Sequence, residues 1–166
     1  WELFKIFKSN KRILLFLFQE KIIKPEKKIY TIFMSSKYSS KDYPSYFYTE
    51  MKEYYDSAFC TIIETNFPEI NSELFEQKRR KGENDTNLCQ IIRKDSIDEF
   101  IEFVNQNNIS LLSQIPQSIF ETNSFLLKYN PTLIEYSAFY GSNQIFKYLK
   151  QNEVELNPSL WLYAIH

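Results

Sequence analysis

Glycine is scarce in this chain, and that scarcity constrains the fold more than any other feature of the sequence. The 166 residues include 2 Gly and 6 Pro. A β-sandwich or barrel needs a turn about every 8 to 12 residues, and glycine and proline are the residues that most often build such turns. The sequence therefore predicts an all-α fold. With 43% hydrophobic and 17% aromatic residues, the chain also has too much apolar material to be disordered throughout.

Two segments repeat one short motif, Asn-Pro followed by Thr or Ser and then Leu. The motif begins at Asn130 and again at Asn157, 27 residues later. Asn suits an N-cap because its side chain accepts a hydrogen bond from a free backbone N–H, and Pro suits the first helical position because it has no N–H to lose. We therefore expect each Asn-Pro pair to start a helix. Gly141 is expected to end the first of these helices in a left-handed conformation.

Three parts of the sequence have the pattern of two short helices joined by a tight turn. The turns are expected at Asn10, Asp95 and Gly141, which are the three residue types that best tolerate a left-handed backbone. The paired helices are expected at 1–7 and 12–20, at 88–93 and from 96 onward, and at 130–140 and 142–150. Further helices are expected at 29–34, 45–55, 57–65, 69–81 and 118–129. Helix pairs that bury their apolar faces on neighbouring pairs form an α-solenoid.

The stretch from Thr132 to Ser142, with Ile145-Phe146 and Leu149 after it, resembles the ankyrin pattern T-P-L-H-x-A-A-x-x-G-H and its downstream apolar residues. Thr132, Ala138 and Gly141 match that pattern, whereas Glu135 and Ser142 stand where it has histidines. The chain as a whole resembles divergent ankyrin-type proteins expanded in parasitic protists, which combine ankyrin repeats with a domain of unknown function. The segments that carry this resemblance are IFKSNKRILLFLFQEKII, FEQKRRKGENDTNLCQIIRKDSIDEFI, SIFETNSFLL and NPTLIEYSAFYGSNQIFKYLKQNEVELNPSLWLYAIH. The resemblance implies an α-solenoid of paired antiparallel helices that binds other proteins.

Two parts of the chain are expected on this basis. Residues 1–85 are interpreted as a divergent helical solenoid segment, and residues 86–166 as ankyrin-like repeats cut within the last one. The chain begins at Trp1 rather than Met and ends at His166 inside an apolar helical pattern. We therefore expect the solenoid to be truncated at both ends.

The charge of the chain is close to balanced, with a formal net charge of -1. Nucleic-acid-binding proteins usually carry a basic excess that neutralises phosphates, so we do not expect nucleic acid as the partner. One basic run, Lys78, Arg79, Arg80 and Lys81, could serve as a nuclear-localisation or phosphate-contacting patch. The favoured interpretation is a helix end whose cations suit the negative end of the helix dipole and which stops at Gly82.

The two cysteines, Cys60 and Cys89, lie in apolar helical contexts and are expected in the core. A secreted chain would more often use a disulfide framework, so we expect an intracellular and cytoplasmic location, with the nucleus as an alternative through the basic run. The longest apolar run, Ile13–Phe18, is too short to span a membrane, so no membrane span is expected.

No pattern typical of catalysis is present in the sequence. A serine or cysteine triad would have to use His166, the single histidine, and no Cys/His cluster has the spacing of a zinc site. Neither Gly82 nor Gly141 lies in a phosphate-binding loop. We expect no enzymatic activity, no cofactor, no metal and no small-molecule substrate.

Five tyrosines crowd one segment: Tyr43, Tyr46, Tyr48, Tyr54 and Tyr55. Tyrosine is enriched in binding surfaces because it offers a large, rigid contact with a polar tip. If these side chains are exposed together, they are the candidate partner-binding surface. The alternative is that they pack between helices with their hydroxyl groups at the surface.

The expected function is therefore a protein-interaction module whose partner is another protein. A purely structural spacer or capping segment of a longer repeat protein is the first alternative. A nuclear or nucleic-acid-associated factor that uses the basic run is the second.

Overall fold

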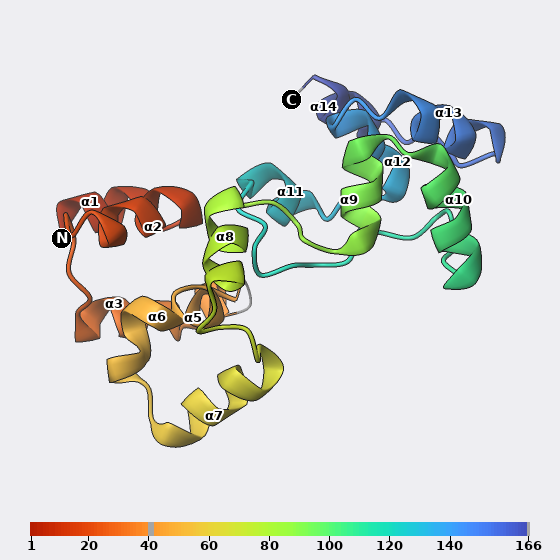
Figure 1. Cartoon of the computed structure of the whole chain (residues 1–166). Helices are drawn as coiled ribbons and strands as arrows, with labels where there is room; N and C mark the ends of the chain where they lie inside the picture. The colour runs from red at the N-terminus through yellow and green to blue at the C-terminus, as the bar shows by residue number, and fades with distance from the viewer. Residues whose placement is uncertain (40–41, 166) are drawn as a thin grey trace. The chain divides into compact units, whose positions relative to one another are not determined.

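The computed structural model describes residues 1–39 and 42–165, and within them the chain is all-helical, as predicted (Figure 1). The chain divides into two compact units. The first unit comprises Trp1–Glu83 and Ile119–Leu127, and the second comprises Asn84–Ser118 and the residues from Lys128 onward. The change of unit after Glu83 lies near the boundary predicted after residue 85, but residues 119–127 belong to the first unit, which the sequence did not indicate.

The first unit consists of short helices around an aromatic core. They are α1 (Glu2–Phe7), α2 (Lys11–Gln19), α3 (Lys27–Phe33), α4 (Ser36–Ser39), α5 (Tyr43–Tyr46), α6 (Tyr48–Met51), the 3-10 helix Lys52–Tyr54, α7 (Ser57–Asn66) and α8 (Glu73–Lys81). Phe4, Phe33 and Phe47 are completely buried, and the rings of Phe33 and Phe47 stack with their centroids 4.9 Å apart. The single helix predicted over 45–55 is wrong, because the backbone leaves helical geometry at Phe47, with φ -100° and ψ 25°.

Arg79 of α8 is the largest of the completely buried side chains of the described residues. Its guanidinium donates two hydrogen bonds to the Glu50 carboxylate, at 2.7 and 2.8 Å, and one to the Tyr46 carbonyl at 2.6 Å. A third carboxylate contact, to Glu76, is 3.0 Å long. A buried charge is tolerated only when it is paired and hydrogen-bonded in this way. The Arg79 pair therefore fixes α8 against α5 and α6.

Replacing Arg79 with methionine is expected to lower the free energy of unfolding by about 3 kcal/mol or more, because Glu50 would be left charged and unpaired in a largely buried place. Urea denaturation followed by circular dichroism measures the change. Arg80→Met, on the exposed side of the same helix, is the matched control and is expected to shift stability by less than about 0.5 kcal/mol. Equal effects of the two substitutions would contradict the buried ion pair.

The second unit is built from two helix pairs and one further helix. The pairs are α9 (Asn87–Lys94) with α10 (Ile97–Gln106), and α12 (Leu133–Phe139) with α13 (Asn143–Gln151), and the further helix is α14 (Leu160–Ala164). Helix α12 contacts α9 on one side and α14 on the other, while α13 contacts α10 (Figure 1). The remaining helix, α11 (Ser124–Tyr129), crosses from the first unit into the second.

Two of the three predicted left-handed turns are confirmed, at Asp95 (φ 54°) and Gly141 (φ 67°). The prediction for Asn10 is wrong, since it is extended at φ -117° and its side chain caps α2 by accepting a hydrogen bond from the Ile13 N–H. For Asn130 the predicted and observed roles are reversed. It was predicted as an N-cap but is left-handed at φ 47°, and Thr132 caps α12 instead. Asparagine suits both roles, so its identity alone does not choose between them.

Asp95 joins the two helix pairs of the second unit. It directly precedes Ser96, the N-cap of α10, and its carboxylate accepts hydrogen bonds at 3.0 Å from the N–H groups of Gln144 and Ile145 in α13. These N–H groups lie in the first turn of α13, where no intrahelical acceptor exists. Helices α10 and α13 therefore begin side by side. Beside this contact, the Ser142 hydroxyl donates to the Ile92 carbonyl at 2.6 Å.

Replacing Gly141 with valine is expected to destabilise the chain by about 1 kcal/mol or more, because a β-branched residue does not tolerate a left-handed backbone. A Cβ atom built at Gly141 meets no atom within 4 Å, so the cost is conformational and not steric crowding. Gly141→Asn, which adds a side chain that accepts this backbone, is expected to cost clearly less. Thermal or urea unfolding of both variants provides the test, and an unchanged valine variant would rule out the turn.

Candidate functional site

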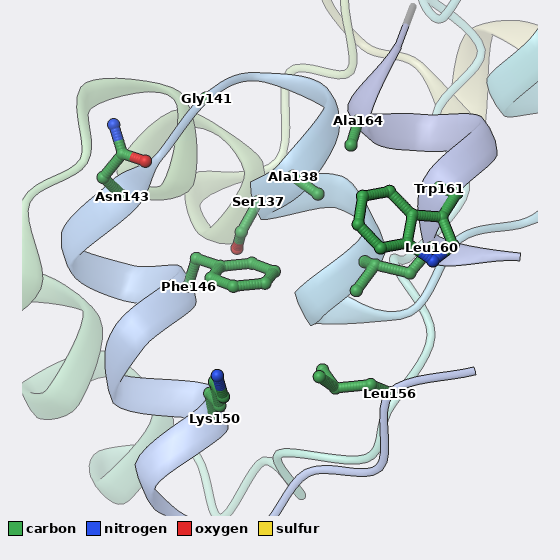
Figure 2. A pocket seen from close by; sticks show the side chains of 10 residues that line it. All are labelled: Ser137, Ala138, Gly141, Asn143, Phe146, Lys150, Leu156, Leu160, Trp161 and Ala164. Carbon is green, nitrogen blue, oxygen red and sulfur yellow. The ribbon is translucent and has the colours of Figure 1, made fainter. Parts of the chain in front are cut away.

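An apolar groove of about 430 Å³ lies in the second unit between α12, α13 and α14. Its lining residues are Ser137, Ala138, Gly141, Asn143, Phe146, Lys150, Leu156, Leu160, Trp161 and Ala164. Figure 2 shows the Phe146 ring reaching from α13 toward Leu160 and Trp161, with Leu156 and Lys150 at one end. The groove is apolar along its length and carries a cation at that end.

Helix α14 forms one wall of the groove and leaves most of its apolar side chains uncovered. Trp161 and Leu162 are 74% and 48% exposed, and of its helical residues only Tyr163 is buried. Scattered apolar residues are normal on a protein surface, but a contiguous set beside a groove marks an interaction site. Trp161 is the largest of these side chains and lies directly on the groove.

Glu135 holds α14 in place. One oxygen of its carboxylate accepts hydrogen bonds from the backbone N–H and hydroxyl of Thr132, at 2.8 and 2.9 Å, and completes a capping box. The other oxygen accepts a hydrogen bond from the hydroxyl of Ser159 at 2.6 Å. Ser159 lies 27 residues after Thr132 and is the N-cap of α14. Glu135, at the position where the ankyrin pattern has histidine, thus connects the starts of two successive helices.

Tyr163 anchors the buried side of α14. Its burial raises the pKa of its hydroxyl to about 12, and the negative charge of Glu135 acts in the same direction. The ring is therefore neutral and apolar over the physiological range. Because Tyr163 faces inward, Trp161 is left at the groove.

The tyrosine segment does not form the exposed patch that one of the sequence interpretations expects. Tyr43, Tyr46, Tyr48 and Tyr55 are buried in the core of the first unit, and Tyr54 is half-buried beside them. Their rings pack against one another and against phenylalanines, as Tyr43 does against Phe33 with centroids 5.3 Å apart. The prediction of an exposed patch is therefore wrong, and the five tyrosines belong to a core cluster. The alternative interpretation expected this packing, but it placed the hydroxyl groups at the surface.

Three of these tyrosines donate their hydroxyl groups to backbone carbonyls of the first unit, while Tyr48 donates to the carboxylate of the exposed Glu64 at 2.6 Å. Tyr46 donates to the Arg79 carbonyl at 3.1 Å and Tyr55 to the Pro44 carbonyl at 3.0 Å. Tyr54 donates to the Pro25 carbonyl at 3.0 Å. Burial raises the pKa of Tyr43, Tyr46 and Tyr55 well above the ordinary value of 10.0.

These raised pKa values predict a loss of stability at high pH. In the unfolded chain the tyrosines ionise near pH 10.0, whereas in the folded chain they stay protonated to higher pH. Their contribution is complete below about pH 10 and is lost as the pH rises toward the folded pKa values. The urea midpoint is expected to fall as the pH is raised from about 10 to about 11.5, and less steeply in Tyr46→Phe, which has one ionisable group fewer. An equal pH dependence in the two proteins would contradict the assignment.

Three of the four cations of the basic run lie beside carboxylates, and the fourth, Arg80, is exposed. Arg79 is buried in the ion pair with Glu50, while Lys78 lies 3.6 Å from Glu69 and Lys81 lies 3.2 Å from Glu83. Helix α8 ends here at Gly82, whose φ of 69° closes the helix in a left-handed conformation. This arrangement matches the interpretation of the run as a helix end.

The described residues hold no group of three or more His, Cys, Asp or Glu side chains that could bind a metal ion. Cys89 is buried and Cys60 half-buried, and both are free thiols. His166, the single histidine, lies outside the described residues. Within 1–39 and 42–165, no helix has the length and apolar character that crossing a membrane requires.

The groove residues Phe146, Lys150 and Trp161 were not predicted from the sequence as a site. Each belongs to a helical pattern that predicts burial as readily as exposure. One signal was available, because residues 160–165 are apolar at nearly every position and one helix face cannot bury all of them.

Comparisons of the chain with known protein families, with curated proteins and with solved structures find no match.

Proposed function

We propose that the chain is a protein-interaction module of ankyrin-like helix pairs that binds another protein through the groove between α12, α13 and α14. The observation that carries this proposal is the exposed Trp161 ring at the groove, opposite Phe146. Aromatic anchors in apolar pockets supply much of the binding energy of protein interfaces. The groove residues contain no pair of groups suited to acid–base or nucleophilic chemistry.

The arrangement of the second unit supports the ankyrin-like part of the proposal. Two helix pairs with a left-handed residue between their members, at Asp95 and Gly141, pack side by side. Thr132 and Glu135 form a hydrogen-bonded pair at the positions where the ankyrin pattern has threonine and histidine. Short paired helices of this kind present extended surfaces to partners.

The proposal is tested by photo-cross-linking in extracts of the cells that make the protein. A photoreactive phenylalanine derivative replaces Leu160 in the groove, and the control carries it at Ile62, which is 56% exposed on α7 in the first unit. We expect a distinct protein to be cross-linked at position 160 and not at position 62. No cross-linked protein at position 160 would favour the structural-spacer alternative.

With the cross-linked protein purified, Trp161→Ala is expected to weaken its binding about tenfold, as removal of a central aromatic anchor does. Ile165→Ala removes an equally exposed apolar side chain from just beyond the same helix, outside the groove lining. It is expected to change the Kd by less than about twofold. Titration calorimetry on the full 166-residue chain measures both values.

A further inference from the structure

In the second unit, the first helix pair is covered by a following helix at the position where the second pair has its groove. A shift of 46 residues superposes the sequence of α9 and α10 on that of α12 and α13, so that Asp95 corresponds to Gly141, Ser96 to Ser142 and Phe100 to Phe146. Phe100 is 0% exposed, and its ring packs edge-on against Tyr148 of α13 with centroids 6.0 Å apart. Phe146 is half-buried and lines the groove. Helix α13 packs on Phe100, but within the described residues no helix packs on Phe146 in the same way.

The same correspondence holds along the rest of the groove. Ser137 and Ala138 correspond to Ile91 and Ile92, which the second pair covers. Helix α14 contacts α12, and α12 contacts α9. By this correspondence, the groove is the place where the second helix of a following pair would lie, beside α13 and α14.

Lys150 favours a negative charge on the helix that occupies the groove. Val104 is 3% exposed in the first pair, and the corresponding residue of the second pair is Lys150, which is exposed at the end of the groove. Lys150 lies one helical turn beyond Phe146. A parallel helix that places an aromatic residue against Phe146 would bring its residue four positions later toward Lys150. A carboxylate there would complement the ammonium group, whereas a cation would be repelled.

We propose that the groove binds a single amphipathic helix of a partner protein, which carries an aromatic residue against Phe146 and a carboxylate four residues later opposite Lys150. This inference rests on the proposed function and names the kind of partner segment that the function requires. The helix begins near Gly141 and runs parallel to α13. Gly141 has no carboxylate to cap this helix, unlike Asp95 in the first pair, so the partner helix supplies its own N-cap.

The probe is a synthetic copy of residues 142–152, the natural occupant of the corresponding position on the first pair. Gln151 is replaced by Glu in both peptides, so that a lactam bridge to Lys147 keeps them helical, because free helices of this length are marginal in water. Asn152, four residues after Tyr148, is replaced by Glu in one peptide and by Lys in the other. Binding of each peptide to the 166-residue chain is followed by fluorescence anisotropy.

We expect the Glu peptide to bind about fivefold more tightly than the Lys peptide, and Lys150→Glu in the protein to reverse this order. Tyr148→Ala in the peptide is expected to weaken binding about tenfold. Gly141→Asp in the protein restores the carboxylate of Asp95 and is expected to tighten binding about threefold. Ile165→Ala, outside the groove lining, leaves all of these values unchanged.

Three results would overturn the inference. The first is no binding of either peptide to the folded chain at about 1 mM, far above the affinity of a specific interface. The second is binding that Lys150→Glu does not alter. The third is self-association of the chain that Phe146→Ala abolishes, or displacement of the peptide by residues following His166 in a longer protein. The third result would assign the groove to a second copy or to the chain itself.

The two proposals fail separately. If a partner protein is cross-linked at position 160 and depends on Trp161, but neither peptide binds, the interaction function stands and the helical occupant is wrong. If the peptides bind with the expected charge preference but no protein is cross-linked, the groove accepts a helix and the interaction function is wrong.

Discussion

The Asp95 carboxylate is the contact on which the geometry of the second unit depends. Asp95 is left-handed in the turn of one helix pair, and its carboxylate accepts hydrogen bonds from the first turn of a helix in the next pair. A single residue therefore closes one turn and also connects the two pairs. The adjacent Ser142–Ile92 hydrogen bond is buried and therefore allows little sliding between the pairs.

The first unit is organised by a different principle, in which charge is buried among aromatic rings. Arg79 reaches Glu50 and the Tyr46 backbone, and the ammonium group of the buried Lys11 lies 5.0 Å from the centre of the Tyr46 ring. Cations pack favourably against tyrosine faces when they also find oxygen acceptors, and Lys11 donates to the Ile119 carbonyl at 2.9 Å. These interactions specify a single arrangement for helices that are too short to be stable alone.

The sequence predicted the all-helical class and the helix pairs because scarce glycine and helical spacing are properties of single segments. It predicted the turns at Asp95 and Gly141 for the same reason, and it failed at Asn10 and Asn130 because asparagine serves equally as a cap and as a left-handed residue. The tyrosine segment could not be placed, since five large amphipathic rings suit a core and a surface alike. The apolar segment 160–165 indicated an uncovered helix face, but not the groove itself, because Phe146 and Trp161 come to line one groove only after α14 packs on α12.

Residues 119–127 belong to the first unit but are synthesised after much of the second unit, and this affects the order in which the two units can fold. Phe120 packs edge-on against Phe75, and Thr122 donates its hydroxyl hydrogen to the Gly82 carbonyl at 2.8 Å. A ribosome must therefore deliver α9 and α10 before the first unit obtains its last core residues. Until then the first unit lacks the side chains that cover Phe75, while the local pair α9–α10 can already form. The two units are thus interdependent in time, although each has its own core, and no single cut in the chain separates them.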